Sequence, residues 1–421
     1  MSSYCMATYR LFDEKADFHK KAQGIAVGLT VGSWTDLPEA KKKHMEKHLG
    51  KVVSVDVHEP PGGERFADIQ IAYPDANFSR DIPALLVTVF GKLSMDGKIK
   101  LLDLHFSESF LEGFAGAKFG VRGVRQLLGV HDRPLLMSIF KSVIGHDLPE
   151  LREQFLLQAL GGVDLIKDDE ILFENPLTPI EKRVEIGMQA AREAERQTGQ
   201  KLLYAVNLSG PAGHLSEQAK KAIAAGANAL LFNVLAYGFD TLRELSSDPE
   251  INVPIAAHPA LAGAFYPSPY HGIAASVLLG KLMRLAGADL VLFPSPYGSV
   301  VMPKEENLAI LQALSATNAA DYIFGGNAEN TADSLRLASS FPVPSAGIHP
   351  GLVPLIIRDF GLDVVVNAGG GVHGHPMGAS AGGWAFRQAI DAVVQGASLQ
   401  EQAGRHPELQ AAVQAWGIKQ A

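Results

Sequence analysis

The chain has 421 residues, of which 47% are hydrophobic and 19% are charged, and its formal net charge is −8 at pH 7. A chain of this length exceeds one ordinary domain, and this composition can fill a large core. The net negative charge and the lack of a basic stripe argue against nucleic-acid binding. No apolar run is long enough for a membrane span. The single cysteine excludes an internal disulfide and fits a cytoplasmic protein.

The first 130 residues predict a small α+β domain. Two apolar segments are separated by "PPGGE" (60–64), which favours a hairpin between them. The elements expected in chain order are strand 4–12, helix 17–29, strands 51–59 and 65–74, helix 82–93 and strand 99–110. This βαββαβ order is typical of a ferredoxin-like fold with helices on one face of the sheet.

From residue 131 onward, short apolar runs alternate with segments of helical periodicity. Eight such runs imply a parallel sheet, and we expect a (β/α)₈ TIM barrel over residues 131–398, with a doubly wound open sheet as the alternative. Residues 315–340 are interpreted as an extended sixth helix plus a loop, and 399–421 as a C-terminal helical extension. The eight expected strand segments are 134–141, 163–170, 202–210, 229–238, 253–260, 289–298, 341–350 and 362–371.

The second barrel run, "GGVDLIKDDE", ends in a lysine and three acids, Lys167–Glu170. Mixed charges at a strand end can simply face water and pair weakly. Alternatively, they can form a hard-metal site, because Mg²⁺ prefers oxygen ligands and enzymes on this fold build their sites at the carboxyl ends of the strands. His258 directly follows the fifth run and faces the same choice between a structural hydrogen bond and a substrate contact.

The last two runs end in small residues. Ser345 and Gly347 follow the seventh run, and Gly369 and Gly370 follow the eighth. Glycines often only make tight turns, but they also let backbone N–H groups approach phosphate oxygens closely. Because barrels frequently bind phosphate between these two loops, we favour a phosphate site there.

Long motifs give the chain a resemblance to a known family. They include "GLTVGSWTDLP", "RPLLMSIFKSVIG", "GGVDLIKDDE", "AHPALAGAF", "LFPSPYGSV", "PSAGIHPGLVP" and "NAGGGVHGHPMG", and they are spread over almost the whole chain. The sequence resembles the RuBisCO large-chain superfamily and, within it, the RuBisCO-like enolases of methionine salvage.

The resemblance implies a metal site. Lys167 would be carbamylated by CO₂ to N6-carboxylysine and would hold one Mg²⁺ per subunit together with Asp169 and Glu170. Asp168 would point away, as the alternation of side chains along a strand also suggests.

The same resemblance argues against CO₂ fixation. Where carboxylases have a glutamate, a second strand-one lysine and an asparagine, this chain has Gly28, Val143 and Thr88, and "PSPYGSVVMP" (294–303) lacks the mobile-loop lysine.

The activity implied is keto–enol tautomerisation of a small phosphorylated 2,3-diketone. Lys92 would be the catalytic base and would act on the barrel of the neighbouring subunit of a homodimer, where Ser33 and Trp34 would help to close the site. Substrate contacts would come from Lys141, His258, Ser345, Gly347, Gly369 and Gly370. The alternatives are another RuBisCO-like activity, such as 5-methylthioribulose 1-phosphate isomerisation, true carboxylation, or a non-catalytic sugar-phosphate binder.

Overall fold

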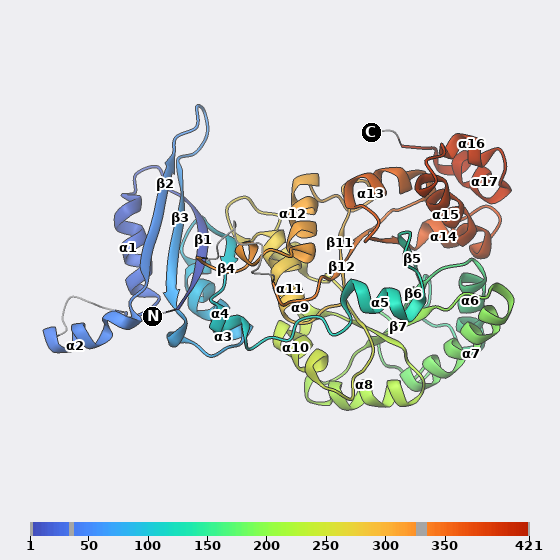
Figure 1. Ribbon diagram of the computed structural model, residues 1–421, viewed down its shortest axis with the longest axis horizontal. Coiled ribbons are helices and arrows are strands. Elements are labelled where there is room, and N and C mark those ends of the chain that lie inside the picture. The colour runs from blue at the N-terminus through green and yellow to red at the C-terminus, as the bar shows by residue number, and fades with distance from the viewer. Residues whose placement is uncertain (1–2, 33–37, 326–334, 420–421) are drawn as a thin grey trace.

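The N-terminal part of the chain forms a five-stranded sheet. The structure, a computed structural model, describes residues 3–32, 38–325 and 335–419 (Figure 1). The strand order is β10-β4-β1-β3-β2, and the four long strands pair antiparallel as expected for a ferredoxin-like domain. These strands are β1 (Tyr4–Phe12), β2 (Lys51–His58), β3 (Phe66–Pro74) and β4 (Ile99–His105), and the fifth is β10 (Gly272–Ile273).

Two helical segments complete the βαββαβ order. The first, α1 (Phe18–Gly28), begins where the Asp17 side chain accepts a hydrogen bond from the Lys20 N–H, 3.0 Å away. The second begins as α3 (Ile82–Leu86) and continues as a π-helix (Val87–Gly91). A short, lysine-rich helix, α2 (Glu39–Met45), precedes β2.

The expected strand 99–110 is too long. β4 ends at His105, and Ser107 caps the short helix α4 (Glu108–Leu111), its Oγ accepting a hydrogen bond from the Phe110 N–H at 3.0 Å. β10, which pairs parallel with β4, was not predicted. It comes from the barrel segment of the chain, and a pairing of two residues leaves no periodic signal.

The eight expected barrel strands are confirmed. All neighbouring strands are parallel, in the order β12-β11-β9-β8-β7-β6-β5-β13, which excludes the doubly wound alternative. At the seam, Asn367 Nδ2 on β13 donates to Ser345 Oγ on β12 at 2.8 Å. The strands are β5 (Leu135–Ile139), β6 (Leu165–Lys167), β7 (Leu203–Leu208), β8 (Ala229–Phe232), β9 (Ile255–Ala257), β11 (Leu290–Pro294), β12 (Phe341–Ser345) and β13 (Val365–Ala368).

Helices surround the barrel (Figure 1). The helices between and after the strands are α6 (Leu148–Leu160), α7 (Ile180–Thr198), α8 (Leu215–Ala224), α9 (Val234–Tyr237), α10 (Phe239–Ser247), a π-helix (Ser276–Lys281) running into α11 (Leu282–Leu285), α12 (Lys304–Ser315), α13 (Val353–Phe360), α14 (Gly370–His373) and α15 (Ala379–Val394). The sixth helix, α12, ends at Ser315, so the expectation that it extends further is wrong for the described residues. Two C-terminal helices, α16 (Leu399–Ala403) and α17 (Pro407–Trp416), follow as expected.

The barrel interior is a packed apolar core rather than a pore. Alternate strand residues such as Met137, Leu231 and Leu292 point inward, and α5 (Gly120–Leu128) adds Val124 and Leu128 at the amino end of the strands. Asp289, just before β11, holds α5 in place by accepting hydrogen bonds from the Phe119 and Gly120 N–H groups, both at 2.8 Å. Among the described residues, α5 thus covers the amino end of the barrel core and leaves the carboxyl ends of the strands as the place for a site.

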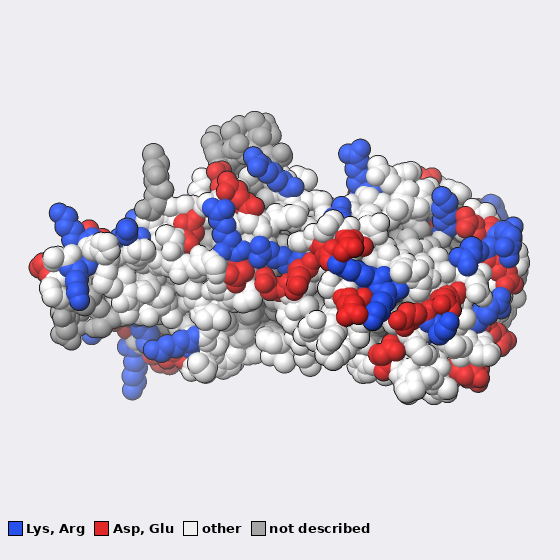
Figure 2. Space-filling model, turned by 90° about the horizontal axis from the view of Figure 1, so that it is seen from below, with Lys and Arg blue, Asp and Glu red and all other residues white. Residues whose placement is uncertain are grey.

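The surface carries both signs of charge. Figure 2 shows lysine and arginine interspersed with aspartate and glutamate over the face it presents, rather than gathered by sign. Among the described residues, no helix has the length and apolar character that crossing a membrane requires.

Candidate active site

Lys167 is the last residue of β6, and its side chain has no exposed surface. Its Nζ donates to the Asp168 carbonyl at 2.8 Å and lies 3.5 Å from Oε2 of Glu170. Burial lowers the pKa of Lys167, because charge is costly away from water. The neutral amine is the form that attacks CO₂, so this environment suits carbamylation.

Two further side chains hold the carboxylates beside Lys167. Lys141, just after β5, places its Nζ 3.1 Å from Oδ2 of Asp169. His258, just after β9, places its Nε2 3.4 Å from Oε2 of Glu170, while its Nδ1 accepts from the Ala260 N–H at 3.2 Å. Burial holds the pKa of His258 well below its usual value, so the ring is neutral and its one proton lies on Nε2, facing Glu170.

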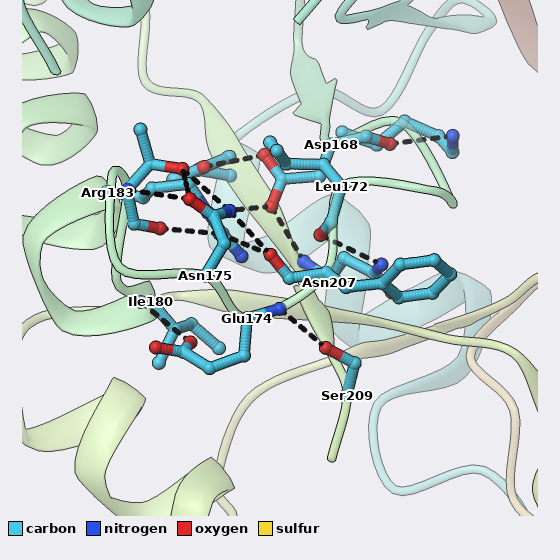
Figure 3. Close-up of polar contacts among 12 residues, drawn as sticks. Asp168, Leu172, Glu174, Asn175, Ile180, Arg183, Asn207 and Ser209 are labelled. Carbon is cyan, nitrogen blue, oxygen red and sulfur yellow. Dashed lines mark hydrogen bonds and ion pairs between the residues drawn. The ribbon is translucent and has the colours of Figure 1, made fainter. Parts of the chain in front are cut away.

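The Asp168 side chain lies beside Arg183 and Asn207 (Figure 3). Its fully buried carboxylate accepts hydrogen bonds from Tyr204 Oη at 2.7 Å and the Asn207 N–H at 2.9 Å. Arg183 of α7 places its Nε 3.5 Å away, and that side chain is also buried. Asp168 therefore anchors the loop after β6 instead of facing the mouth.

Two asparagines fix the backbone of Glu170. Asn207, near the end of β7, donates from Nδ2 to the Glu170 carbonyl at 3.1 Å and to the Leu172 carbonyl at 3.2 Å. Asn233, just after β8, donates to the same Glu170 carbonyl at 3.2 Å. Neither residue had a predicted role. Their positions at polar strand ends were the available signal.

The donor set fits a divalent cation only after Lys167 is modified. No group of three or more histidine, cysteine, aspartate or glutamate side chains among the described residues is arranged to hold a metal ion. Asp169 and Glu170 supply carboxylate oxygens, and a carbamate on Lys167 would add the third oxygen ligand. Carbamylation changes Lys167 from a cation to an anion. A bound divalent cation would balance the negative charge that this change adds to the site.

The predicted phosphate loops lie at the ends of β12 and β13. Gly347 has φ +68°, and a Cβ there would lie 2.5 Å from the Ser299 N. A Cβ on Gly369 would lie 2.6 Å from Cε of Lys141. Backbone contact and positive φ thus require glycine at position 347, as the tight-turn interpretation holds, whereas the flexible Lys141 side chain could move to admit a Cβ at position 369. Gly370 is different, because a Cβ there would meet no atom within 4 Å, which leaves its backbone open to a ligand.

Ser345 occupies the last position of β12. Its Oγ donates to the Val343 carbonyl at 2.8 Å and accepts from Asn367 at 2.8 Å. Both contacts position the hydroxyl at the seam of the barrel, and sequence analysis missed Asn367 entirely.

Strained backbone is concentrated at this end of the barrel. Among the described residues, the non-glycine residues with positive φ are Ser142 (+56°), Leu261 (+73°) and Ala346 (+71°). Ser142 follows Lys141, and Ala346 lies between Ser345 and Gly347. Such conformations cost about 1–3 kcal/mol each and tend to occur at functional sites.

Lys92 lies in the N-terminal domain, outside the cluster described above. It directly follows the π-helix Val87–Gly91, and its side chain is exposed. It lines a cavity of about 560 Å³ together with Gly28 of α1 and Met95. π-Helical turns are frequent at functional sites. Among the described residues, no hydrogen bond or ion pair links Lys92 to this chain's own barrel. Ser33 and Trp34 lie outside the described residues.

Two family models match the chain. Residues 3–110 match the N-terminal domain of the ribulose bisphosphate carboxylase large chain, and residues 120–416 match its catalytic domain.

Similar proteins cover the chain almost completely. An enzyme of Geobacillus thermodenitrificans named 2,3-diketo-5-methylthiopentyl-1-phosphate enolase is 54% identical over 99% of this chain and 98% of its own. A protein of the same name from Exiguobacterium sibiricum is 53% identical over 99% of both chains.

Solved structures of RuBisCO and RuBisCO-like proteins are also similar to this chain. A RuBisCO-like protein from Alicyclobacillus acidocaldarius superposes with a TM-score of 0.90 and 48% identity, over 99% of this chain and 100% of that one. An archaeal RuBisCO from Hyperthermus butylicus, described as dimeric, superposes with a TM-score of 0.87 and 31% identity, over 99% of this chain and 96% of that one.

Proposed function

Because the chain belongs to the ribulose bisphosphate carboxylase large-chain family, we propose that it is a RuBisCO-like enolase rather than a carboxylase. The reaction is the conversion of 2,3-diketo-5-methylthiopentyl 1-phosphate to 2-hydroxy-3-keto-5-methylthiopentenyl 1-phosphate in methionine salvage. The observation that carries the proposal is the cluster of Lys141, Lys167, Asp169, Glu170 and His258 at the barrel mouth, in a chain 54% identical over 99% of its length to a protein named for this activity.

The loss of carboxylase residues supports the same conclusion. Val143, which stands where carboxylases have a second lysine, is a buried side chain with 3% exposure in the apolar core. It offers no charged group to an intermediate that has gained CO₂. The segment 294–303 after β11 carries no lysine either.

The metal centre would be held by Lys167 as N6-carboxylysine, Asp169 and Glu170, with one Mg²⁺ in each subunit. When bound, Mg²⁺ supplies Lewis acidity toward the ketone oxygens of the substrate. Lys141 orients Asp169 through its contact at 3.1 Å, and His258 orients Glu170 through its contact at 3.4 Å.

The proton transfer is assigned to Lys92 of the partner subunit. Its amine takes one proton from C1, the electrons of that C–H bond form the C1=C2 double bond, and the oxygen on C2 gains a proton to give the enol. Gly347, Gly369, Gly370 and Ser345 would bind the phosphate and so hold C1 near the base. Lys141 would stabilise the negative charge that develops on the ketone oxygens.

This assignment makes the working unit a homodimer. Lys92 is exposed on the N-terminal domain, and no described contact joins it to its own barrel. A two-fold dimer would bring each Lys92 to the other subunit's barrel mouth through the same surface on both chains. We also propose a cytoplasmic location, which the single cysteine fits.

The competing activities are separated by one assay. Purified protein is mixed with the diketone phosphate, with and without Mg²⁺ and bicarbonate, and the absorbance of the enol is followed. We expect enol formation that requires both additions. The isomerase alternative predicts turnover of 5-methylthioribulose 1-phosphate instead. Binding of either compound without turnover would support the non-catalytic binder.

A further inference from the structure

Leu261 combines two features that seldom occur together in a leucine. Its side chain is 60% exposed, and its φ of +73° lies in the left-handed region that favours glycine or asparagine. It lies four residues beyond the end of β9 and three residues after His258. A leucine at such a position offers nothing but apolar surface.

The surrounding loop fixes this conformation. The Ala262 N–H donates to the Pro259 carbonyl and the Ala264 N–H donates to the Leu261 carbonyl, both at 2.9 Å. The Ala260 N–H donates to Nδ1 of His258 at 3.2 Å. The loop that carries Leu261 is therefore tied to the histidine that contacts Glu170.

The other two strained residues adjoin groups that already have a proposed role. Ser142 follows Lys141, and Ala346 lies between Ser345 and Gly347. Leu261 is the one strained non-glycine position, among the described residues, without a polar partner in the proposed reaction. Its exposed apolar side chain would complement an apolar part of a ligand.

The substrate of the proposed function has such a group. Its phosphate and two ketones are polar, whereas the chain beyond C3 ends in an apolar thioether. The phosphate loops follow β12 and β13, and β11 separates β9 from β12 in the sheet. If the ketones lie over Glu170 and Asp169, the thioether chain extends away from the phosphate loops and toward the loop after β9.

We infer that Leu261 contacts the methylthioethyl tail of the substrate and determines specificity for it; this inference rests on the proposed function. The test compares the tailed substrate with 2,3-diketobutyl 1-phosphate, which ends at C4 and has no tail. Leu261→Gly removes the side chain and relieves the left-handed strain, so loss of folding does not explain its effect. Leu261→Asn tolerates the same φ and presents a polar group.

The quantity measured is the ratio of kcat/KM for the tailed substrate to kcat/KM for the short one. We expect this ratio to fall about tenfold in both variants, as removal of an apolar contact of this size predicts. Leu362→Asn is the matched control, because Leu362 is 42% exposed but precedes β13 at the amino end of the barrel. Its ratio should equal that of the unmodified protein.

An unchanged ratio in Leu261→Gly would overturn the inference while leaving the enolase function intact. Equal losses for both substrates, accompanied by a weaker dimer in sedimentation, would also overturn it and would assign Leu261 to the subunit interface. Failure of the unmodified protein to turn over either diketone would overturn the proposed function and the inference together.

Discussion

The Nζ of Lys167 lies 3.5 Å from Oε2 of Glu170, at a strand end where the lysine side chain is completely buried. An ion pair so placed removes the hydration of the lysine, whereas Glu170 stays 32% exposed, and such pairs are weak evidence for stability. The arrangement is better explained if the lysine becomes a carbamate and shares a divalent cation with the carboxylates.

Replacing Lys167 tests this explanation. Lys167→Ala should abolish both enol formation and its stimulation by bicarbonate, because one oxygen ligand is lost. In ¹³C-bicarbonate with Mg²⁺, the unmodified protein should show a carbamate resonance in its NMR spectrum that the variant lacks. Lys182→Ala, which removes a 57% exposed lysine on α7, is the control and should keep the resonance. Normal turnover by Lys167→Ala without added CO₂ would rule out the carbamate.

Substitutions of the two neighbouring aspartates, Asp168 and Asp169, should have different effects on stability and on Mg²⁺ binding. Asp168→Asn leaves buried Arg183 without its counter-charge and should lower the free energy of unfolding by about 3 kcal/mol. Asp169→Asn should change the free energy of unfolding less but should weaken Mg²⁺ binding. Denaturant unfolding and calorimetric Mg²⁺ titration in bicarbonate separate the two effects. Equal loss of Mg²⁺ affinity in both variants, with unchanged stability, would contradict the geometry.

The hydrogen bonds from Asn207 and Asn233 to the Glu170 carbonyl yield a separate prediction. Asn233→Ala removes a hydrogen bond of 3.2 Å to the Glu170 carbonyl and should weaken Mg²⁺ binding roughly tenfold, as is usual for groups that orient metal ligands. The control is Asn228→Ala, since Asn228 donates to the Leu202 carbonyl at the other end of β7. Asn228→Ala should lose stability and keep its Mg²⁺ affinity. Identical Mg²⁺ affinities for both variants would show that the Asn233 hydrogen bond does not help to position Glu170.

The shared site can be tested by complementation. Lys92→Ala and Lys167→Ala should each be inactive, but a heterodimer of the two contains one site with both defects and one with neither. Partial activity should therefore return after subunit exchange, with heterodimers verified by mass spectrometry of tagged chains. If proven heterodimers stay inactive, Lys92 and the metal ligands do not combine across subunits.

Sequence patterns predicted those parts of the fold that local periodicity determines. The eight apolar runs became eight parallel strands because each alternates with a helical segment long enough to return the chain. Alternation along β6 also predicted that Asp168 points away from Lys167. The identity of its partner was not predictable, because Arg183 comes from α7 and reaches Asp168 only in the folded structure.

Other features leave little local signal. β10 has only two residues, and its pairing with β4 depends on how the barrel lies against the N-terminal sheet. Asn207 and Asn233 were visible as polar strand ends, but their common target, the Glu170 carbonyl, is a backbone group that no side-chain motif encodes. The left-handed conformation of Leu261 is likewise invisible in a sequence, since leucine seldom adopts it.

The central step of the proposed reaction is the loss of one C1 proton to Lys92. The measurement uses the diketone phosphate with deuterium at both C1 positions, and follows the product by proton and deuterium NMR with Mg²⁺ and bicarbonate present. Proton removal by Lys92 predicts an enol that keeps a single C1 deuterium, formed by the unmodified protein and not by Lys92→Ala. Enol formation by Lys92→Ala at the normal rate, or a product that keeps both deuterium atoms, would contradict it.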